Sequence, residues 1–466
     1  MIDLPQHAAQ ISIWKHFDDP CYRFDQTFEF SWFTPYLFGY VLIRCVAAIL
    51  PVDRAVEVAI YLAVVALPLA IRSLLRYSEG DRWLSLLGFP LAFGFTFYWG
   101  FVNYLIAIPV AVFYLTLAYE LSSRPHIGRA VLLAGVSVLL LVSHALIFLY
   151  CAAAATALAL FVRPRRHAAV LLLPAALPVP ALIWWVGQMR GSESLVRHPI
   201  GWNLGIYRLL HLPSVLLSDE RDTFAIVFVL FVVAAIAVSG ARPTADARRW
   251  VFFALAAVIY FCGPQSAFGT AFLFHRFAVF VAIGLLIVLH TKGREMPAWS
   301  RALIVIAVIG WCSLLAVRFH RFDGEASEFD AILSVIPANR RIASYTAYPN
   351  SEAVPGAVFL HFPAYYHERK GGVTSWSFAT FFPQLIRYRA GAAPKLGGSV
   401  LFDPAHLDWE GLSTFDYVVI RAPRDPTPAL AAKAPYPLFP TRRSGMWWLY
   451  ATPRGRAARD SCPPLE

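Results

Sequence analysis

The chain has 466 residues, of which 58% are hydrophobic and 15% charged, and its formal net charge is +11. Ordinary globular domains carry about 25% charged residues, so a soluble fold of this size could not bury so much apolar surface. The composition predicts a protein embedded in lipid, and it excludes a disordered chain and a secreted disulfide scaffold. The basic residues are scattered between apolar segments, so the positive charge does not indicate a nucleic-acid partner.

The first thirty residues are polar and lack the apolar stretch of a cleavable signal peptide. Asp3, Pro5 and His7 open an amphipathic run that reaches Phe17. Pro5 suits the first turn of a helix and Asp3 suits its capping position, so Asp3 and His7 would lie about one turn apart. A carboxylate and an imidazole at this spacing can act as a base and its partner or as two metal ligands. The alternative is an ordinary helix start with a solvated histidine.

A membrane helix needs about 20 apolar residues to cross a bilayer core about 30 Å thick. Segments that have or approach this length are Trp32–Leu50, Val56–Ile71, Trp83–Tyr98, Tyr104–Leu121, Ala130–Val162, Ala168–Gly187, Phe224–Ser239, Trp250–Gly263, Ala271–His290 and Ala302–Val317. Ala130–Val162 is either one very long helix or two short helices that break near Ser143 and His144. We therefore expect ten or so membrane helices.

Short cytoplasmic loops collect arginine and lysine, which orients the helices. The basic clusters between segments are Arg124 with Arg129, Arg163 with Arg165 and Arg166, Arg242 with Arg248 and Arg249, and Lys292 with Arg294 and Arg301. If Ala130–Val162 is a pair of helices, every cluster falls on the cytoplasmic side and the chain from His320 onward lies outside. The same count puts Met1–Ser31 inside, and one helix more or fewer reverses it.

The last third of the chain has a mixed polar and apolar texture that is typical of a small α/β domain. Expected helices are Glu325–Ile336 and Thr427–Ala434, and expected strands are Arg341–Tyr345, Phe415–Arg421 and Met446–Ala451. We therefore divide the chain into a first-loop segment (1–31), a transmembrane helical domain (32–319) and an α/β domain with a loose tail (320–466).

Basic residues in the polar link Gln188–Asp222 are the first candidates for binding a phosphate, because arginine offers a bidentate fork to phosphate oxygens. They are Arg190, Arg197, His198, Arg208, His211 and Arg221. Arg208 and His211 are the preferred pair, since they lie three residues apart on an expected short helix. Trp202, Asn203 and Tyr207 beside them suit a sugar ring. The alternative is a solvated loop that touches anionic lipid headgroups.

His275 and Arg276 lie inside the apolar run Ala271–His290, where a charge at mid-bilayer costs about 2.5–3.5 kcal/mol on insertion scales. Arg276 could bind a carrier phosphate near the outer boundary, or it could only snorkel to that boundary. Asn103 and His144 are weaker candidates for substrate contact, because polar residues between helices often make interhelical hydrogen bonds. Asp403, His406 and Asp408 suggest either a metal site or a polar loop.

Six cysteines are present. Cys45, Cys151, Cys262 and Cys312 lie in apolar stretches, where a buried hydrophobic role is expected. Cys21 and Cys462 lie outside these stretches and could pair if both face an oxidising compartment.

The order of these features resembles the GT-C superfamily of polytopic membrane glycosyltransferases, especially its uncharacterised bacterial members. The matching parts are the acidic motif at Asp3–His7, the apolar helices after it, the Gly100–Tyr104 run, the pair Ser143-His144 and a small C-terminal domain. GT-C enzymes have a membrane helix before the acidic motif, whereas this chain begins two residues ahead of Asp3, so either the true start lies further upstream or the protein is truncated.

The resemblance implies an enzyme of the bacterial inner membrane that moves a sugar from a polyprenyl-phosphate donor to a saccharide, lipid or protein acceptor on the outer face. Asp3 would be the base or the ligand of a divalent cation such as Mg or Mn, and His7 would orient it. The donor phosphate would contact Arg276, His275, Arg208 and His211. The sugar and acceptor would contact Trp202, Asn203, Tyr207, Asn103 and His144. The C-terminal domain would be periplasmic.

Two other functions remain open at this point. A transporter or flippase of a lipid-linked saccharide would show paired broken helices in corresponding halves of the chain, and we see no such internal symmetry. In a non-catalytic subunit of an envelope polysaccharide complex, the acidic and basic groups would be solvated and far apart.

Overall fold

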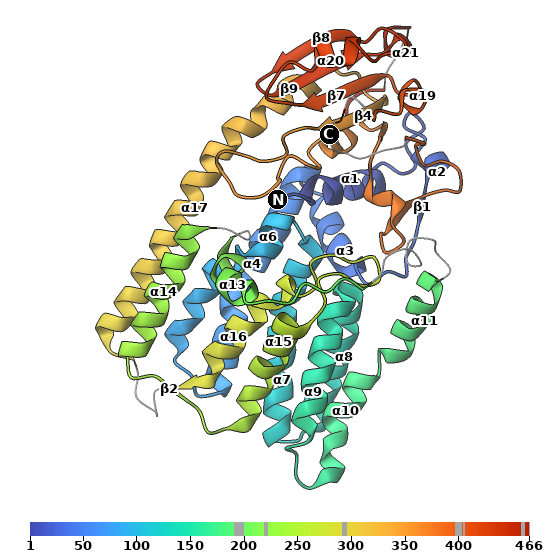
Figure 1. Cartoon of the computed structure of the whole chain (residues 1–466). Helices are drawn as coiled ribbons and strands as arrows, with labels where there is room; N and C mark the ends of the chain where they lie inside the picture. The colour runs from blue at the N-terminus through green and yellow to red at the C-terminus, as the bar shows by residue number, and fades with distance from the viewer. Residues whose placement is uncertain are drawn as a thin grey trace. The chain divides into compact units, whose positions relative to one another are not determined.

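The computed structural model describes residues 1–190, 200–218, 222–290, 296–396, 403, 406–457 and 462–465. These residues form a mainly helical structure with a small C-terminal sheet region (Figure 1). The chain divides into two compact units. Unit 1 contains Met1–Trp32, Leu42–Glu57 and Leu315–Glu466, and unit 2 contains Phe33–Val41 and Val58–Leu314.

Four helical segments are long and apolar enough to cross a membrane. They are α4 (Val52–Tyr77), α7 (Val102–Ser123), the span Arg165–Met189 formed by η2 (Arg165–Ala168), α10 (Ala169–Ala176) and α11 (Val179–Arg190), and α17 (Ala298–Leu333). Shorter helices are α3 (Leu37–Val46), α8 (Ile127–Ser143), α9 (Ala145–Ala159), α13 (Tyr207–Leu217), α14 (Thr223–Val238), α15 (Ala247–Cys262) and α16 (Ala278–Val288), which follows η3 (His275–Phe277). The part of the chain that the structure describes thus shows four full-length spans, where the sequence predicts ten or so.

Breaks in the helices have local causes. The run Ala130–Val162 forms the pair α8 and α9, as one of the two expected arrangements has it, because His144 adopts an extended backbone between them. The expected span Trp83–Tyr98 is wrong. Its residues form η1 (Arg82–Leu87), α5 (Gly88–Ala92) and α6 (Phe95–Trp99), interrupted where Gly94 meets a backbone carbonyl: an added Cβ would lie 2.4 Å from the oxygen of Leu216.

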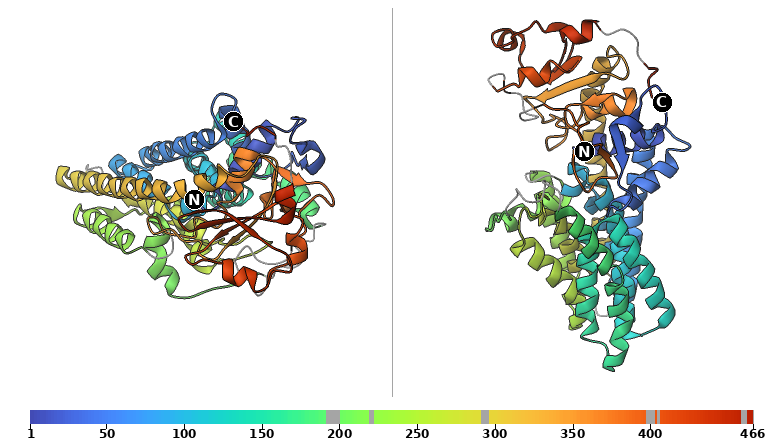
Figure 2. Two further views of the ribbon diagram at one scale, coloured as in Figure 1. Left: turned by 90° about the horizontal axis from the view of Figure 1, so that it is seen from above. Right: turned by 90° about the vertical axis from the view of Figure 1, so that its right-hand side faces the viewer.

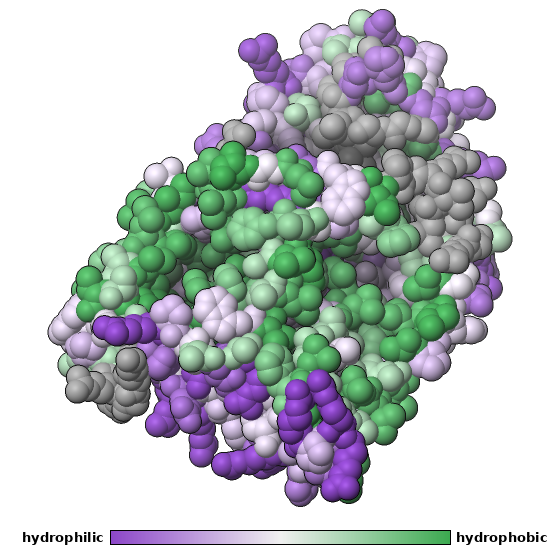
Figure 3. Space-filling model, turned by 60° about the horizontal axis from the view of Figure 1, so that its bottom comes forward, coloured by the Kyte–Doolittle hydropathy of each residue, from purple (hydrophilic) through white to green (hydrophobic). Residues whose placement is uncertain are grey.

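Unit 2 exposes large apolar side chains on its helices. Leu69, Leu173, Ile183 and Ile306 are each between 62% and 69% exposed. A space-filling view shows a broad hydrophobic surface with hydrophilic residues gathered along one edge (Figure 3). Soluble proteins rarely expose contiguous apolar patches of this kind. The apolar helices therefore indicate association with a lipid bilayer.

Unit 1 contains a five-stranded sheet of order β5-β4-β7-β9-β8. Its strands are β4 (Arg341–Thr346), β5 (Val373–Thr374), β7 (Tyr417–Arg421), β8 (Phe439–Ser444) and β9 (Trp447–Ala451). β5, β4 and β7 run parallel, while β9 and β8 are antiparallel to their neighbours. The three strands predicted from sequence are confirmed as β4, β7 and β9. The predicted helices correspond to the end of α17 and to α20 (Thr427–Ala431).

The N-terminal helix α1 (Leu4–Lys15) packs in unit 1 against α18 (Ala364–Lys370), so the blue and orange segments lie side by side in Figure 1. Its residues from Pro5 to Ile13 are all buried, so the expectation of an amphipathic run is wrong. Side-chain amides explain how a polar helix is buried: Gln10 accepts a hydrogen bond from the N–H of Ile386 at 2.8 Å and donates one to its carbonyl at 3.1 Å. Gln6 makes the same kind of double contact with backbone groups of the segment after β5.

A disulfide bond joins Cys21 and Cys462, whose Cα atoms are 5.7 Å apart, as the sequence allowed. The N-terminal segment and the C-terminus therefore meet within unit 1 (Figure 2). A short two-stranded sheet formed by β1 (Phe28–Phe30) and β6 (Ile386–Tyr388) joins the N-terminal segment to a second part of unit 1.

Candidate functional site

Asp3 forms a buried pair with a histidine that the sequence did not connect to it. Its Oδ1 lies 2.9 Å from Nδ1 of His361, 358 residues along the chain. Each residue is only 8% exposed. Asp3 occupies the capping position of α1, but its side chain does not cap the helix, because the carboxylate turns to His361 instead. The capping role expected for the Asp3 side chain is therefore wrong.

The pair lies beside the segment that leaves the carboxyl end of β5. His361 follows β4 through a loop that folds back on itself, since Phe359 donates its N–H to the carbonyl of Pro349 at 2.9 Å. Trp376 follows β5 by two residues, and its ring stacks on that of His361 with centroids 4.0 Å apart. The carboxyl ends of neighbouring parallel strands meet at one edge of a sheet, which is where open α/β folds bind ligands. Asp3 is brought to this edge by α1.

His7 is close to the pair but has a different environment. Its ring packs edge-on against Phe378, with centroids 5.3 Å apart, and it is 6% exposed. Burial lowers the pKa of His7 to about 4, while the neighbouring Asp3 carboxylate opposes this shift. His7 is therefore neutral near pH 7. The histidine bonded to Asp3 is therefore His361, and not His7 as we expected.

The pair has the parts needed to move a proton. A carboxylate that accepts from Nδ1–H of an imidazole fixes the tautomer that leaves Nε2 free to accept a proton, and it stabilises the imidazolium that results. Among the described residues, Nε2 of His361 has no hydrogen-bond partner. An acceptor hydroxyl within reach of Nε2 could therefore be deprotonated.

Asp3 Oδ1 and His361 Nδ1 are bonded to each other, so Oδ2 and Nε2 are the atoms of the pair that could face a cation. Within the described ranges, no three His, Cys, Asp or Glu side chains converge as a ligand set. We derive no step through the Mg or Mn ion that the sequence suggested.

Unit 2 contains a second constellation, centred on Arg276. The guanidinium carbon lies 3.9 Å from the centre of the Phe101 ring, and Nη1 lies 3.5 Å from Nε2 of His144. Nη2 donates to the carbonyl of Ala271 at 3.2 Å. The residue is 8% exposed and starts a helix in η3, so it does not stand inside one long span as Ala271–His290 predicted. Two separate candidates from the sequence, Arg276 and His144, are thus in contact.

The Gly100–Tyr104 run builds the surroundings of Arg276. Gly100 has a positive φ of 76°, which lets the chain turn between α6 and α7 and presents Phe101. Tyr104 donates its hydroxyl to the carbonyl of Arg276 at 2.7 Å. Asn103 is buried against Gly39, where an added Cβ would lie 2.0 Å from its Oδ1. Asn103 thus packs α7 closely on α3.

Arg208 is a third candidate, and its contacts hold neighbouring helices together. It is 1% exposed, it donates to the carbonyls of Asn203 and Tyr260 at 2.8 Å each, and it lies 3.8 Å over the ring of Phe274. These contacts fix the start of α13 to α15. Among the described residues, its Nη2 has no hydrogen-bond partner.

The other residues proposed to touch donor or sugar are spread around this centre. His275 is buried in a stack with Phe274 and Phe95, at centroid distances of 3.8 and 4.6 Å. His211 is half-buried beside Tyr207, whose hydroxyl bonds the carbonyl of Asn203. Trp202 is 58% exposed. Arg197, His198 and Arg221 lie outside the described residues, as does the side chain of Arg190.

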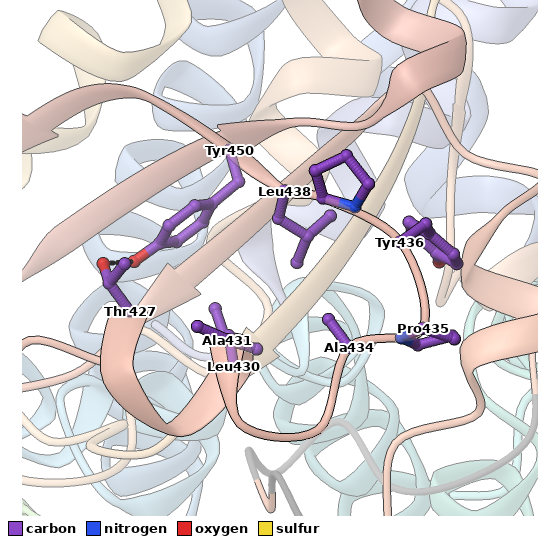
Figure 4. A pocket seen from close by; sticks show the side chains of 9 residues that line it. Thr427, Leu430, Ala431, Ala434, Pro435, Tyr436, Leu438 and Tyr450 are labelled. Atoms are coloured by element: carbon purple, nitrogen blue, oxygen red, sulfur yellow. Dashed lines mark hydrogen bonds between the residues drawn. The ribbon is translucent and has the colours of Figure 1, made fainter.

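The C-terminal sheet region contains a cavity and an exposed Asp–His pair, and we assign an acid–base role to neither. A cavity of about 460 Å³ is lined by Thr427, Leu430, Ala431, Ala434, Pro435, Tyr436, Pro437, Leu438 and Tyr450 (Figure 4). The Tyr450 and Thr427 hydroxyls bond each other at 2.9 Å, and the lining has no carboxylate, histidine or cation. Asp403 and His406 bond each other at 2.6 Å but are largely exposed, which agrees with the polar-loop alternative.

Comparison with protein families, with characterised proteins and with solved structures finds no match to this chain.

Proposed function

We propose that the chain is a membrane glycosyltransferase of the GT-C type, which moves a sugar from a polyprenyl-phosphate carrier to an acceptor hydroxyl. The observation that carries the proposal is the buried pair of Asp3 and His361, with Oδ1 and Nδ1 2.9 Å apart. A buried carboxylate–imidazole pair at the carboxyl edge of parallel strands suits proton removal from a nucleophile.

The surroundings of Arg276 support the proposal that the donor is a lipid phosphate. An arginine that starts a helix in an apolar unit, with aromatic and imidazole neighbours, can balance the charge that develops on a departing phosphate. Arg208 is an additional cation of the same unit. The pair and the cations belong to different units, so we test each assignment separately.

We further propose that unit 1 lies on the outer face of a bacterial inner membrane. The bond between Cys21 and Cys462 supports this placement, because disulfides persist in oxidising compartments and are rare in the cytosol. Under this proposal the N-terminal segment lies outside, in contrast to the count of basic clusters, which puts Met1–Ser31 inside.

The test uses the full chain in proteoliposomes with a panel of radiolabelled undecaprenyl-phosphate-linked hexoses and pentoses. Transfer is measured to water and to a saccharide fraction from a bacterial envelope. Asp3→Asn and Arg276→Gln should each reduce transfer by about 10²–10⁴-fold, as expected for loss of an acid–base or charge-stabilising group.

The matched controls are Asp18→Asn, an exposed carboxylate of unit 1, and Arg129→Gln, an arginine of unit 2 paired with Glu120, and both should retain transfer. Full activity of Asp3→Asn would reject the acid–base assignment. Movement of the labelled lipid across the bilayer without any transfer would favour the flippase alternative.

A further inference from the structure

We infer that the carboxyl edge of β4 and β5 is the binding site for an acceptor saccharide, and that His361 takes the proton from its hydroxyl while Asp3 only positions His361. The inference rests on the proposed function and names the acceptor class and the proton acceptor. It differs from the sequence-based expectation, which made Asp3 the base.

The hydrogen bond between Asp3 and His361 indicates which of these two residues is the base. Oδ1 of Asp3 lies 2.9 Å from Nδ1 of His361, and an ionised carboxylate can only accept a hydrogen bond, so we assign the shared proton to Nδ1. Nε2 lies on the opposite side of the ring and, in the described parts of the chain, has no hydrogen-bond partner. A hydroxyl that approaches the pair therefore finds a basic lone pair on His361. Because Asp3 also closes the first turn of α1 through its backbone carbonyl, the carboxylate is held on a rigid element.

The surface beside His361 fits a sugar ring. Trp376 is half-buried and its ring stacks on that of His361. The ring centroids of Phe381 and Trp376 are 5.9 Å apart, and Phe381 is 39% exposed. Aromatic faces with a partly open edge pack well against the C–H groups of a pyranose. Phe378 and His7 complete the apolar wall, and His7 is neutral near pH 7. None of the side chains named here is a lysine or arginine, and the Asp3 carboxylate lies beside them, so an uncharged saccharide suits the cluster better than an anionic acceptor.

The step balances without a further reactant. The acceptor oxygen forms a bond to C1 of the donor sugar as its proton passes to Nε2 of His361. The bond between C1 and the phosphate oxygen breaks, and the phosphate leaves with the electron pair. The imidazolium, held by the Asp3 carboxylate, then releases its proton to water.

The kinetic experiment compares variants of the full chain in proteoliposomes with the donor of the panel that the wild type uses. His361→Ala should lose transfer by at least 10³-fold, and added imidazole should restore part of it. Asp3→Asn should lower kcat but retain residual transfer that imidazole does not raise. Phe381→Ala should raise KM for the acceptor with little change in kcat. His406→Gln is the matched control, since it removes an Asp-bonded histidine of the same unit that is exposed.

A second measurement does not depend on activity. In protein labelled with ¹⁵N-histidine, the resonance lost in His361→Gln should show a protonated Nδ1 and an unprotonated Nε2, and Asp3→Asn should abolish this pattern. A protonated Nε2 in the wild type would overturn the inference, as would full transfer by His361→Ala. If the wild type uses no donor of the panel, the proposed function fails, while the NMR result still decides which nitrogen faces Asp3.

Discussion

Replacement of Gln10 by methionine tests whether α1 is the buried element that carries Asp3 to the sheet edge. The Gln10 amide satisfies both the N–H and the carbonyl of Ile386 in β6, and the residue is 1% exposed. Methionine fills a similar volume but supplies neither bond. A buried backbone group that loses its partner costs about 1–3 kcal/mol, so the two groups together should cost about 2–6 kcal/mol of unfolding free energy.

The assay is thermal unfolding of the purified chain in detergent, followed by tryptophan fluorescence. Gln26→Met is the matched control, because Gln26 is exposed on α2 (Phe24–Thr27). We expect Gln10→Met to lower Tm by several degrees and the control to leave it within one degree. Equal Tm values for the two variants would refute the reasoning, since they would show that α1 lies on a surface as an amphipathic helix.

Three further predictions concern packing, pH and the disulfide. Gly284→Ala would place a Cβ 2.6 Å from Cα of Phe253, so α15 and α16 must separate, which should cost about 1–3 kcal/mol of unfolding free energy. Gly135→Ala is the control, because its Cβ would meet nothing within 4 Å. Equal Tm values for the two variants would contradict the close contact of α15 and α16. Burial lowers the pKa of His367 to about 4. As pH falls from 6.5 to 4, the unfolded chain therefore binds a proton at this residue that the folded chain does not bind. The folded state should lose up to about 3 kcal/mol of stability over this range. His367→Phe should flatten the dependence of Tm on pH over this range, and an unchanged slope would count against it. In intact cells, Cys462 should react with a membrane-impermeant maleimide in Cys21→Ser but not in the wild type. The label is located by peptide mapping, because Cys45 and Cys262 are also exposed, and labelling of Cys462 in the wild type would exclude the disulfide.

The sequence predicted local elements well and distant partners poorly. The hydrophobic runs of β4, β7 and β9 were visible because buried strands have continuous apolar patterns. The break at His144 was visible as a polar pair in an apolar run. In contrast, His361 has no fixed spacing to Asp3, and only the fold brings residues 358 positions apart into contact.

The spacing of the amides in α1 does not by itself show that the helix is buried. Gln6 and Gln10 lie four residues apart and so share one face of a helix. Polar side chains usually face water, so such a face is normally taken to be exposed. The physical reason for the error is that amide side chains can replace a strand partner, since each offers one donor group and one acceptor. Only the position of β6 shows that such a partner is needed.

The arginines of unit 2 show why the structure was needed to choose Arg276 and Arg208 among the candidate phosphate-binding residues. Arg129 and Arg248 form ion pairs with Glu120 and Asp246, which neutralise their charge near solvent. The contacts of Arg276 and Arg208 instead include aromatic faces, at 3.9 and 3.8 Å, and backbone carbonyls. Such neighbours stabilise a guanidinium without cancelling its charge. All four appear in the sequence as arginines beside apolar runs, so only their contacts in the structure distinguish the two inner residues from the two that meet Glu120 and Asp246.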